Sequence, residues 1–410
     1  MRLKFLLSVL MAAILVGCDK ENAPSPDTSV KDFDFTFRYD APLTTINQFE
    51  LLLTQKDGEV LLDTLLSTGT QHALTAKTND PKLNLTLVTP DAANRNMYSI
   101  TTYNQVNPDK WHIVAGFTTE VNEPTLAAEI RYTNIPYDAK AFFSSKQSNW
   151  TGLSWPNPTD NYLIANYNRL LPTDLAYILL PTHGKYMFTE ASSDLMSVDF
   201  SNANTSTKLK YNRPANITKF RTFLHGYSKA GDYTHTQPLF NSDYMSSEAY
   251  DLQYPSTVIE EFELNVYYTD ADGYQHRYNH IGSAVPQIMP FSEKSNFKVA
   301  KSDFSDFQVS FTDNLPSLYF SRWALATADV NANWYIYSSP EEVSYNPKRI
   351  LEELKPKLLA GKSVAGFKLS SVQTIKAPNY TYQSYCDYYG SPEARAKKTM
   401  KETQQIGKSF

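Results

Sequence analysis

The chain has 410 residues, a formal net charge of −5 at pH 7 and 20% charged residues. This acidic balance argues against a nucleic-acid-binding protein, because such proteins carry clustered positive charge that neutralises phosphates. The chain has only two cysteines, whereas tyrosine (28) and phenylalanine (22) are frequent and glycine (14) is scarce. Abundant aromatic residues favour β-sheet, and scarce glycine disfavours the glycine-rich loops that hold phosphate groups.

The first residues of the chain have the regions of a secretory signal. Arg2 and Lys4 are positively charged, and residues 5–16 then form an apolar run with one serine in it. This run is shorter than the roughly 20 residues with which a helix spans a bilayer. It therefore predicts a signal peptide that is removed from the mature protein.

The apolar run ends in Leu15-Val16-Gly17-Cys18. This signal resembles the lipobox of bacterial lipoproteins. The resemblance implies cleavage just before Cys18, a diacylglyceryl group on its thiol and an acyl chain on its new amine. Two or more acyl chains hold a protein stably on a membrane, whereas one binds only marginally. We therefore expect residues 1–17 to be the signal peptide, residues 18–30 to be the lipidated cysteine with a polar tether, and the protein to lie in the cell envelope, at the outer membrane.

Residues 31–128 have the patterns of antiparallel β-structure. The first segment alternates aromatic and polar residues without a break, with the aromatic positions at Phe33, Phe35, Phe37 and Tyr39. The pair Asp57-Gly58 lies between two apolar runs and is typical of a β-hairpin turn. We expect this range to be an N-terminal β-sandwich domain.

Residues 129–290 are expected to form a second β domain. The clearest strand is 261–268, in which one face is apolar and the other carries Glu261, Glu263 and Asn265. We expect the polar face to be solvated, since that is the default for an alternating strand. The turn at 269–273 ends in Asp-Gly and predicts a hairpin that returns the chain through residues 274–278.

Residues 291–410 are expected to form a C-terminal β-rich domain with a helix near 347–360. Asn346 is a good N-cap and Pro347 suits the first helical position. Pro356 should kink this helix or split it into two pieces, and Gly361 can end it. The last residues, 392–410, include a basic cluster and predict a frayed helix or a disordered tail.

These patterns predict a mainly β protein built from tandem antiparallel β-sandwich domains with one short C-terminal helix. If Cys18 is lipidated, Cys386 is left alone, and an intramolecular disulfide cannot form. We expect Cys386 to be a small buried side chain, since free cysteine is among the most buried residue types.

Two segments have ligand-type residues at the wrong geometry for a metal ion. His276 and His280 lie four residues apart on an expected strand, about 13 Å from each other, whereas zinc–nitrogen bonds are about 2.0–2.1 Å long. The segment 270–273 has the acidic residues of a calcium loop, but Asn279 stands where the bidentate glutamate is needed. The sequence therefore predicts no metal and no cofactor.

The sequence contains no specific catalytic motif. The nucleophile-elbow pattern of serine hydrolases is absent from it. Glu261 and Glu263 would lie about 6.7 Å apart on one face of a strand, and we expect that face to be solvated. We therefore predict no catalytic residues and a protein that is not an enzyme.

Aromatic side chains in polar surroundings are the candidate ligand-binding residues. Trp150 and Trp155 lie in a polar, proline-bearing stretch that Tyr162 follows, and the segment 379–385 is rich in tyrosine with amides between the rings. Sugar- and peptide-binding surfaces combine flat apolar rings with amide hydrogen bonds. The alternative is that these rings fill the open ends of sandwiches.

The sequence predicts a lipid-anchored, non-enzymatic binding or accessory module outside the cytoplasm. Its partners would be the membrane, through Cys18, and a glycan, peptide or protein, but no nucleic acid. The expected organisation resembles surface lipoproteins that stack sandwich domains outward from a lipid anchor, including those that accompany glycan uptake. One alternative is a fimbrillin-like structural or anchor subunit of a pilus, and a second is a hydrolase without a recognisable motif.

Replacing the lipobox cysteine tests the anchor. Cys18→Ala should release the protein from membranes and abolish the incorporation of radiolabelled fatty acid, because no acyl chain can then be attached. Cys386→Ala is the matched control and should retain both label and membrane location. A wild-type protein that takes up no label and washes off at neutral pH would contradict the lipoprotein prediction.

Overall fold

The protein is described here from a computed structural model. The residues that the structure describes are 30–41, 46–91, 96–115, 123–137, 139–146, 152–154, 161–244, 251–290, 295–312 and 314–410. They form mainly β-strands, which are arranged in six sheets with three α-helices between or beside them. This confirms the prediction of a mainly β fold with sandwich-like domains.

One sheet of twelve strands runs through most of the molecule. In spatial order its strands are β18 (Gln237–Asn241), β17 (Thr218–Tyr227), β20 (Glu261–Thr269), β21 (Gln275–Gly282), β28 (Glu402–Ser409), β27 (Lys368–Lys376), β24 (Leu318–Ala326), β25 (Asn331–Ser338), β6 (Met97–Val106), β5 (Leu83–Pro90), β2 (Gln48–Thr54) and β3 (Val60–Ser67). All neighbouring strands are antiparallel except β25 and β6, which run parallel. The expected hairpins are present: β2 and β3 are joined by the Asp57-Gly58 turn, and β20 and β21 by the turn at 270–274.

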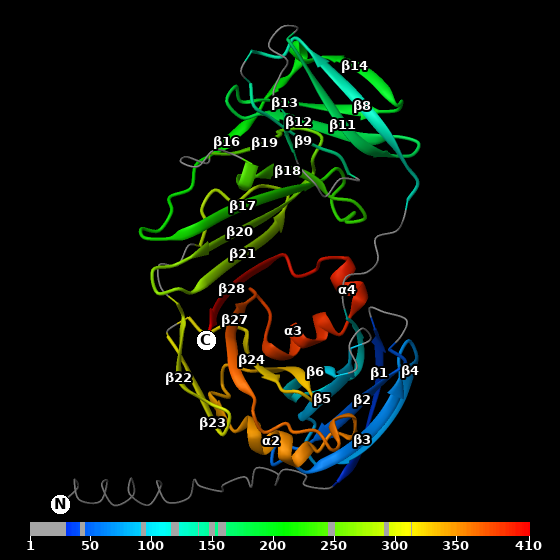
Figure 1. Cartoon of the computed structure of the whole chain (residues 1–410), viewed down its shortest axis with the longest axis vertical. Coiled ribbons are helices and arrows are strands. Elements are labelled where there is room, and N and C mark those ends of the chain that lie inside the picture. Colours follow the sequence, from blue (N-terminus) through cyan, green and yellow to red (C-terminus); the bar gives the residue numbers. More distant parts are fainter. Residues whose placement is uncertain are drawn as a thin grey trace, which may run out of the picture.

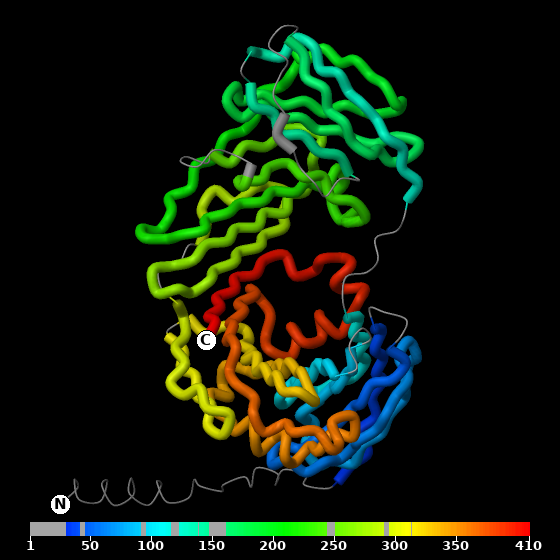
Figure 2. Tube along the Cα trace, in the orientation of Figure 1, coloured from blue at the N-terminus to red at the C-terminus, as the bar shows by residue number. Residues whose placement is uncertain are grey.

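The path of the chain through this sheet is not sequential. The chain begins in the lower lobe of Figure 1, crosses to the upper lobe, and returns to the lower lobe for its last third (Figures 1 and 2). The return is completed by β28, which pairs with β21 on one side and β27 on the other. The last strand of the chain therefore joins the strands of the upper lobe to those of the lower lobe.

The N-terminal and C-terminal segments share two hydrophobic cores. In one core, Leu52 and Ile100 pack with Trp323 and Trp334. In the other, Phe37 packs among residues that include Leu318 and Tyr382. The sequence assigns the ranges 31–128 and 291–410 to separate domains, whereas here they are parts of one lobe. Local sequence patterns cannot show this, because the β6–β25 pairing joins segments more than two hundred residues apart.

The described residues also form five smaller sheets. They are β4 (Gln71–Thr78), β1 (Lys31–Asp40) and β7 (Lys110–Val114); β10 (Gly152–Ser154), β9 (Ala141–Ser144), β12 (Asp174–Leu180), β13 (Lys185–Ala191) and β15 (Asn204–Thr205); β11 (Tyr162–Leu170), β8 (Thr125–Thr133) and β14 (Leu195–Asp199); β16 (Thr207–Leu209) and β19 (Leu252–Tyr254); and β22 (Phe297–Asp303), β23 (Asp306–Phe311) and β26 (Ser344–Tyr345). In the upper lobe, Tyr177 and Leu179 of β12 pack on Leu224 and Leu264 of the large sheet. This packing fixes β17 and β20 from one side and leaves their other face for the site described below.

The α-helices of the described residues are short and lie in the last quarter of the chain. They are α2 (Pro347–Leu354), α3 (Tyr382–Tyr389) and α4 (Pro392–Ala396), with single 3₁₀ turns at Phe200–Asn202, Ser242–Tyr244 and Lys357–Leu359. The sequence predicted α2, gave a frayed helix as one alternative for the segment that contains α4, and did not predict α3. Within the described part of the chain, none of these helices has the length and apolar character needed to cross a membrane.

Helix α2 begins as the sequence predicts and ends earlier. The Asn346 side chain accepts a hydrogen bond from the amide of Arg349, and Pro347 is the first helical residue. The helix stops at Lys355, just before Pro356, and a separate 3₁₀ turn follows, so Pro356 splits the predicted helix in two. Ala360 caps this second piece, and Gly361 follows it with a φ of 75°.

The prediction of a frayed helix or disordered tail for residues 392–410 holds only for a short helix at the start of this segment and is wrong for the rest. Residues 392–396 form α4, and residues 402–409 form β28 inside the large sheet. The position of β28 inside a sheet cannot be predicted from its sequence, because Ile406 is its only large apolar residue. Its stability comes from hydrogen bonds to a strand on each side and not from an alternating pattern.

Replacing the residue that ends α2 tests the observed helix boundary. Lys355 has a φ of 44°, a left-handed conformation that costs a residue with a Cβ atom about 1 kcal/mol. Lys355→Gly should therefore raise the free energy of unfolding by roughly 0.5–1 kcal/mol in a denaturant titration. Lys355→Ala, which keeps the Cβ atom, is the control and should bring no such gain. Equal effects of both variants would contradict the boundary at Lys355.

Candidate functional site

The candidate site lies on one face of β17, β20 and β21. Leu264 and Val266 of β20 point into the upper-lobe core, and the alternate residues point to the opposite face, as the sequence predicts. The expectation that this opposite face is solvated is wrong. Glu261 is only 7% exposed and Asn265 only 8%. Two connections cover these residues, one between β17 and β18 and the other between α4 and β28.

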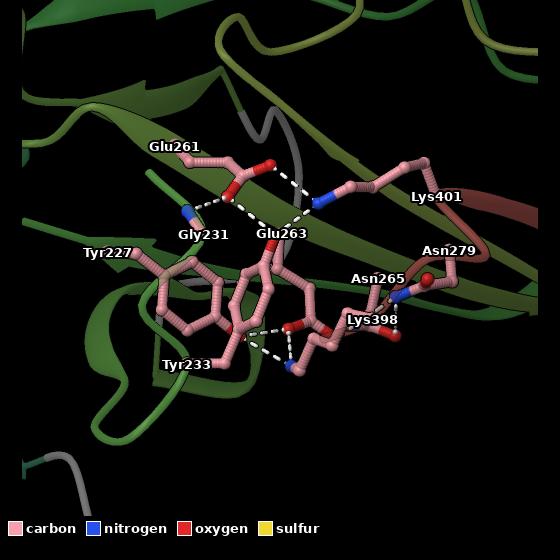
Figure 3. A network of polar contacts seen from close by, with 9 residues as sticks. All are labelled: Tyr227, Gly231, Tyr233, Glu261, Glu263, Asn265, Asn279, Lys398 and Lys401. Atoms are coloured by element: carbon pink, nitrogen blue, oxygen red, sulfur yellow. Dashed lines mark hydrogen bonds and ion pairs between the residues drawn. The ribbon is translucent and has the colours of Figure 1, made fainter. Parts of the chain in front are cut away.

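Glu261 is held by groups from both connections (Figure 3). Its Oε1 lies 2.8 Å from Nζ of Lys401, and its Oε2 accepts hydrogen bonds from the hydroxyl of Tyr233 at 2.7 Å and the amide of Gly231 at 3.1 Å. Lys401 also donates to the Tyr233 hydroxyl. Burial opposes ionisation of Glu261, but these contacts outweigh it and lower the pKa of its carboxyl group. Glu261 is therefore a carboxylate at neutral pH.

Glu263, two residues further along β20, also has a lysine and a tyrosine as partners. Its Oε2 lies 2.5 Å from Nζ of Lys398 and accepts a hydrogen bond from the hydroxyl of Tyr227, and its Oε1 accepts one from Nδ2 of Asn279 at 3.2 Å. Nδ2 of Asn279 also lies 3.1 Å from Oδ1 of Asn265. Burial opposes ionisation here too, but Lys398 and Tyr227 outweigh it and lower the pKa of Glu263. We call the two glutamates with Tyr227, Tyr233, Lys398 and Lys401 the acid–lysine network.

The pKa shifts of two neighbouring side chains keep the charges of the network constant at neutral pH. Burial, and then the nearby Glu263, raise the pKa of Tyr227, so its hydroxyl stays protonated and donates. Burial lowers the pKa of His225, an effect that Glu263 partly opposes. At neutral pH the network therefore consists of two carboxylates, each neutralised by a lysine and oriented by a tyrosine.

A trough of about 1130 Å³ extends from the network along the same sheet face. Its floor is formed by Phe223 on β17, Tyr267 on β20 and Arg277 on β21. The rings of Phe223 and Tyr267 meet edge to face, with centroids 5.8 Å apart. The guanidinium carbon of Arg277 lies 5.1 Å from the centroid of Tyr267. Amide and hydroxyl groups, from residues that include Asn265 and Gln275, complete the lining. The trough therefore combines aromatic faces with polar groups.

An irregularity of β17 adds a further cation to the trough. The pairing of β17 with β20 shifts register between Thr218 and Arg221. Lys219 lies in this bulge with a φ of 52° and belongs to the trough lining. Bulges are frequent beside binding sites because they redirect side chains, and a residue with a Cβ atom in this conformation is strained.

A second cavity, of about 400 Å³, lies between the Asp57-Gly58 turn and α2. Four of its five charged lining residues pair with one another: Lys56 with Glu342 and Arg349 with Glu353, each at 2.6 Å. Paired charges leave little for a ligand to contact. The trough is therefore the better candidate for a binding site.

The two histidines lie on β21, as the sequence predicts. His276 is buried, and its Nε2 lies 2.8 Å from Oδ2 of Asp270. Burial lowers the pKa of His276, although Asp270 opposes this effect. Oδ1 of Asp270 accepts the amides of Asp272 and Tyr274, so the hairpin itself uses this carboxylate. Among the residues that the structure describes, no group of three or more His, Cys, Asp or Glu side chains is arranged to hold a metal ion.

The structure describes only part of the aromatic candidates. Trp150 and Trp155 lie outside the described residues, as does Cys18. Tyr162 begins β11 in the upper lobe, and the guanidinium carbon of Arg131 lies 3.8 Å from its ring centroid. Tyr162 does not line the trough, and its predicted role in binding stays a prediction.

Two rings of the tyrosine-rich segment 379–385 fill a core. Tyr382 and Tyr385 lie on α3 and are buried beside Cys386 in the core shared by the N- and C-terminal segments. Burial raises the pKa of the Cys386 thiol, which keeps it protonated and unreactive. The interpretation as core-filling rings is confirmed for Tyr382 and Tyr385, and so is the prediction of a buried Cys386.

Sequence reasoning missed the residues that complete the network. Lys398 and Lys401 belong to the basic cluster that the sequence assigned to a tail, and Tyr227 and Tyr233 belong to no motif. The signal that could have paired them is charge complementarity between the acidic segment 260–263 and the basic segment 395–401.

Comparisons with known proteins do not identify the chain. No protein-family model matches it, and no curated protein matches it. Among solved structures it is similar to the TIE protein of Bacillus anthracis, with 8% identity over 60% of this chain and a TM-score of 0.15. The match covers 46% of that protein, so the chain spans about half of its length. A similarity of this size carries no argument about function.

Removing one lysine tests the acid–lysine network. Lys398→Met leaves the carboxylate of Glu263 unpaired, and breaking a fully buried pair costs about 3–5 kcal/mol. Because Lys398 is 27% exposed, we expect a loss of roughly 2–3 kcal/mol of unfolding free energy at pH 7. The lowered pKa of Glu263 contributes its full stability above the unfolded-state pKa, and this contribution is lost as pH falls through the folded-state pKa. The difference between wild type and variant should therefore shrink as pH falls below about 4.

Lys397→Met is the matched control for this experiment. Lys397 pairs with Glu393 on the surface of α4 and should contribute little. Equal denaturation midpoints for the two variants at pH 7, or a Lys398→Met defect that grows toward acid pH, would contradict the assignment.

Proposed function

We propose that this protein is a lipid-anchored binding protein of the cell envelope, held at the outer membrane through Cys18, and that the trough binds a saccharide. The anchor is supported by the lipobox-like motif that ends at Cys18. The binding role is supported by one observation above all, the pair formed by Phe223 and Tyr267 on the floor of the trough. Apolar faces of sugar rings stack on such aromatic faces, and nearby amides bond their hydroxyl groups.

The location of the trough favours a saccharide over a peptide. Extended peptides commonly bind by adding a strand to an open sheet edge, where main-chain groups are free. The trough lies instead on the face of three interior strands, β17, β20 and β21, each paired on both sides. A face offers side chains and no main-chain ladder, which suits a ligand that is recognised through rings and hydroxyls.

The state of the glutamates favours binding over hydrolysis. A glycoside hydrolase needs one carboxyl group with a raised pKa to protonate the leaving oxygen. Both glutamates of the acid–lysine network have lowered pKa values and carry a lysine and a tyrosine as partners. We therefore assign them a positioning role, in which they hold the wall of the trough.

The fimbrillin-like alternative fits the terminal strands less well. Strand exchange between copies would have to displace a strand from its own sheet. In this structure β1 lies between β4 and β7 and contributes the buried Phe35 and Phe37 to a core. β28 lies between β21 and β27. Displacing either strand would expose a core or open the large sheet.

Aromatic substitutions on an array of short oligosaccharides, both neutral and acidic, test the proposed function. The wild-type protein should bind at least one member, and Tyr267→Ala should remove roughly 1–3 kcal/mol of binding, by analogy with aromatic stacking on nucleic-acid bases. Tyr162→Ala is the control, because this tyrosine is also paired with an arginine but lies outside the trough. A melting curve should show that each variant remains folded.

Two outcomes would contradict the proposal. A wild-type protein that binds no member of the array would exclude the saccharide function for those classes of sugar. Loss of binding in Tyr162→Ala with full binding in Tyr267→Ala would move the site to the region that the sequence predicts.

A further inference from the structure

The cations of the trough form a row across three adjacent strands. Arg221 of β17 lies opposite Tyr267 of β20, and Tyr267 lies opposite Arg277 of β21. Neighbouring strands are about 4.7–4.9 Å apart, so the two arginines flank the Tyr267 ring with their Cα atoms about 10 Å apart. The register therefore places an arginine on the strand at either side of Tyr267.

These cations are only partly neutralised within the protein. Arg221 lies 3.4 Å from Asp243 in an exposed pair, with side chains 57% and 41% exposed. Among the described residues Arg277 forms no ion pair, and its contact is with the face of Tyr267. Lys219, directed by its bulge, adds a third positive charge. The one carboxylate in the lining, Glu263, is already neutralised by Lys398.

An excess of positive charge in the trough contrasts with the negative charge of the whole chain, which is −5. The overall field of an acidic protein disfavours the approach of anions. A local row of arginines on such a protein is therefore expected to have a specific partner. Arginine binds carboxylate and sulfate groups through two parallel hydrogen bonds, which also orients them.

We infer that the ligand of the trough is an acidic saccharide, whose carboxylate or sulfate groups are bound by Arg277 and Arg221 while one sugar ring packs against the aromatic pair of Phe223 and Tyr267. This inference rests on the proposed saccharide function and adds the charge of the ligand. A carboxylate or sulfate group of the ligand would form the ion pair that Arg277 lacks among the described residues. Glu263 also lines the trough, but Lys398 neutralises its carboxylate, so it does not repel the ligand.

Matched oligosaccharides test this inference by calorimetry. The probes are an oligogalacturonate and its carboxyl-reduced neutral counterpart, and a sulfated oligosaccharide and its desulfated counterpart. At least one acidic probe should bind about tenfold or more tightly than its neutral counterpart, because hydrogen bonds to charged groups contribute about 1.5–3 kcal/mol. Added salt should weaken the binding of that acidic probe and leave any neutral binding unchanged.

Arginine substitutions locate the charge contact. Arg277→Gln should weaken the binding of the acidic probe about tenfold or more and leave neutral binding nearly unchanged. Arg131→Gln is the matched control, since Arg131 covers Tyr162 as Arg277 covers Tyr267. It should retain full binding of the acidic probe.

The outcomes separate this inference from the proposed function. If neutral sugars bind as tightly as their acidic counterparts and Tyr267→Ala still removes binding, the saccharide function stands and the acidic ligand is excluded. If neither acidic nor neutral probes bind, both fail. If an acidic probe binds equally to wild type and Arg277→Gln, the assignment of its charge to the arginine row is wrong.

Discussion

The structure depends on the pairing of β28 with β21 and β27. The upper-lobe strands end at β21, the lower-lobe strands begin at β27, and β28 supplies the hydrogen-bonding partner that each would otherwise lack. Each of the two pairings joins six residues of β28 to a neighbour. Because β28 pairs on both sides, it joins the strands of the two lobes into one sheet. Each backbone hydrogen bond in these pairings contributes about 0.5–1.5 kcal/mol to stability.

The same strand places the functional face. The segment before β28 must run across the ends of β17 and β20 to reach its position, and this brings Lys398 and Lys401 onto the two glutamates of β20. Two carboxylates on a nearly buried strand face would otherwise repel each other and lose their hydration. A lysine and a tyrosine bind each carboxylate, neutralise it and hold it in one position. The trough then presents its aromatic floor and its arginines to the outside.

Sequence patterns predicted the elements that depend on residues close together in the chain. The alternation of β1, the hairpin between β20 and β21, and the N-cap of α2 at Asn346 depend on neighbours in the chain. Helix α3 was missed because its tyrosines have strand propensity, although Thr381 and Ser384 form a capping box. β28 was missed because Ile406 is its only large apolar residue.

The candidate site was predictable only in part. The alternation of β20 gave Glu261, Glu263 and Asn265 a common face, but not the groups that cover it. The two lysines among those groups come from a segment more than a hundred residues away, and β28 brings them into contact with the glutamates. The row of Arg221, Tyr267 and Arg277 depends on the register of three strands, including a bulge that no local pattern marks.

Hydrogen exchange of the β28 amides is the most direct measurement of this arrangement. If β28 joins the two lobes, its amides should be protected to the same degree as those of the interior strands β20 and β24, and should exchange only when the whole sheet opens. The amide of Ile281, which donates to the carbonyl of Lys401 at 2.7 Å, should be protected with them. Exchange of the β28 amides within seconds, at the rate of a flexible tail, would contradict the central role of this strand.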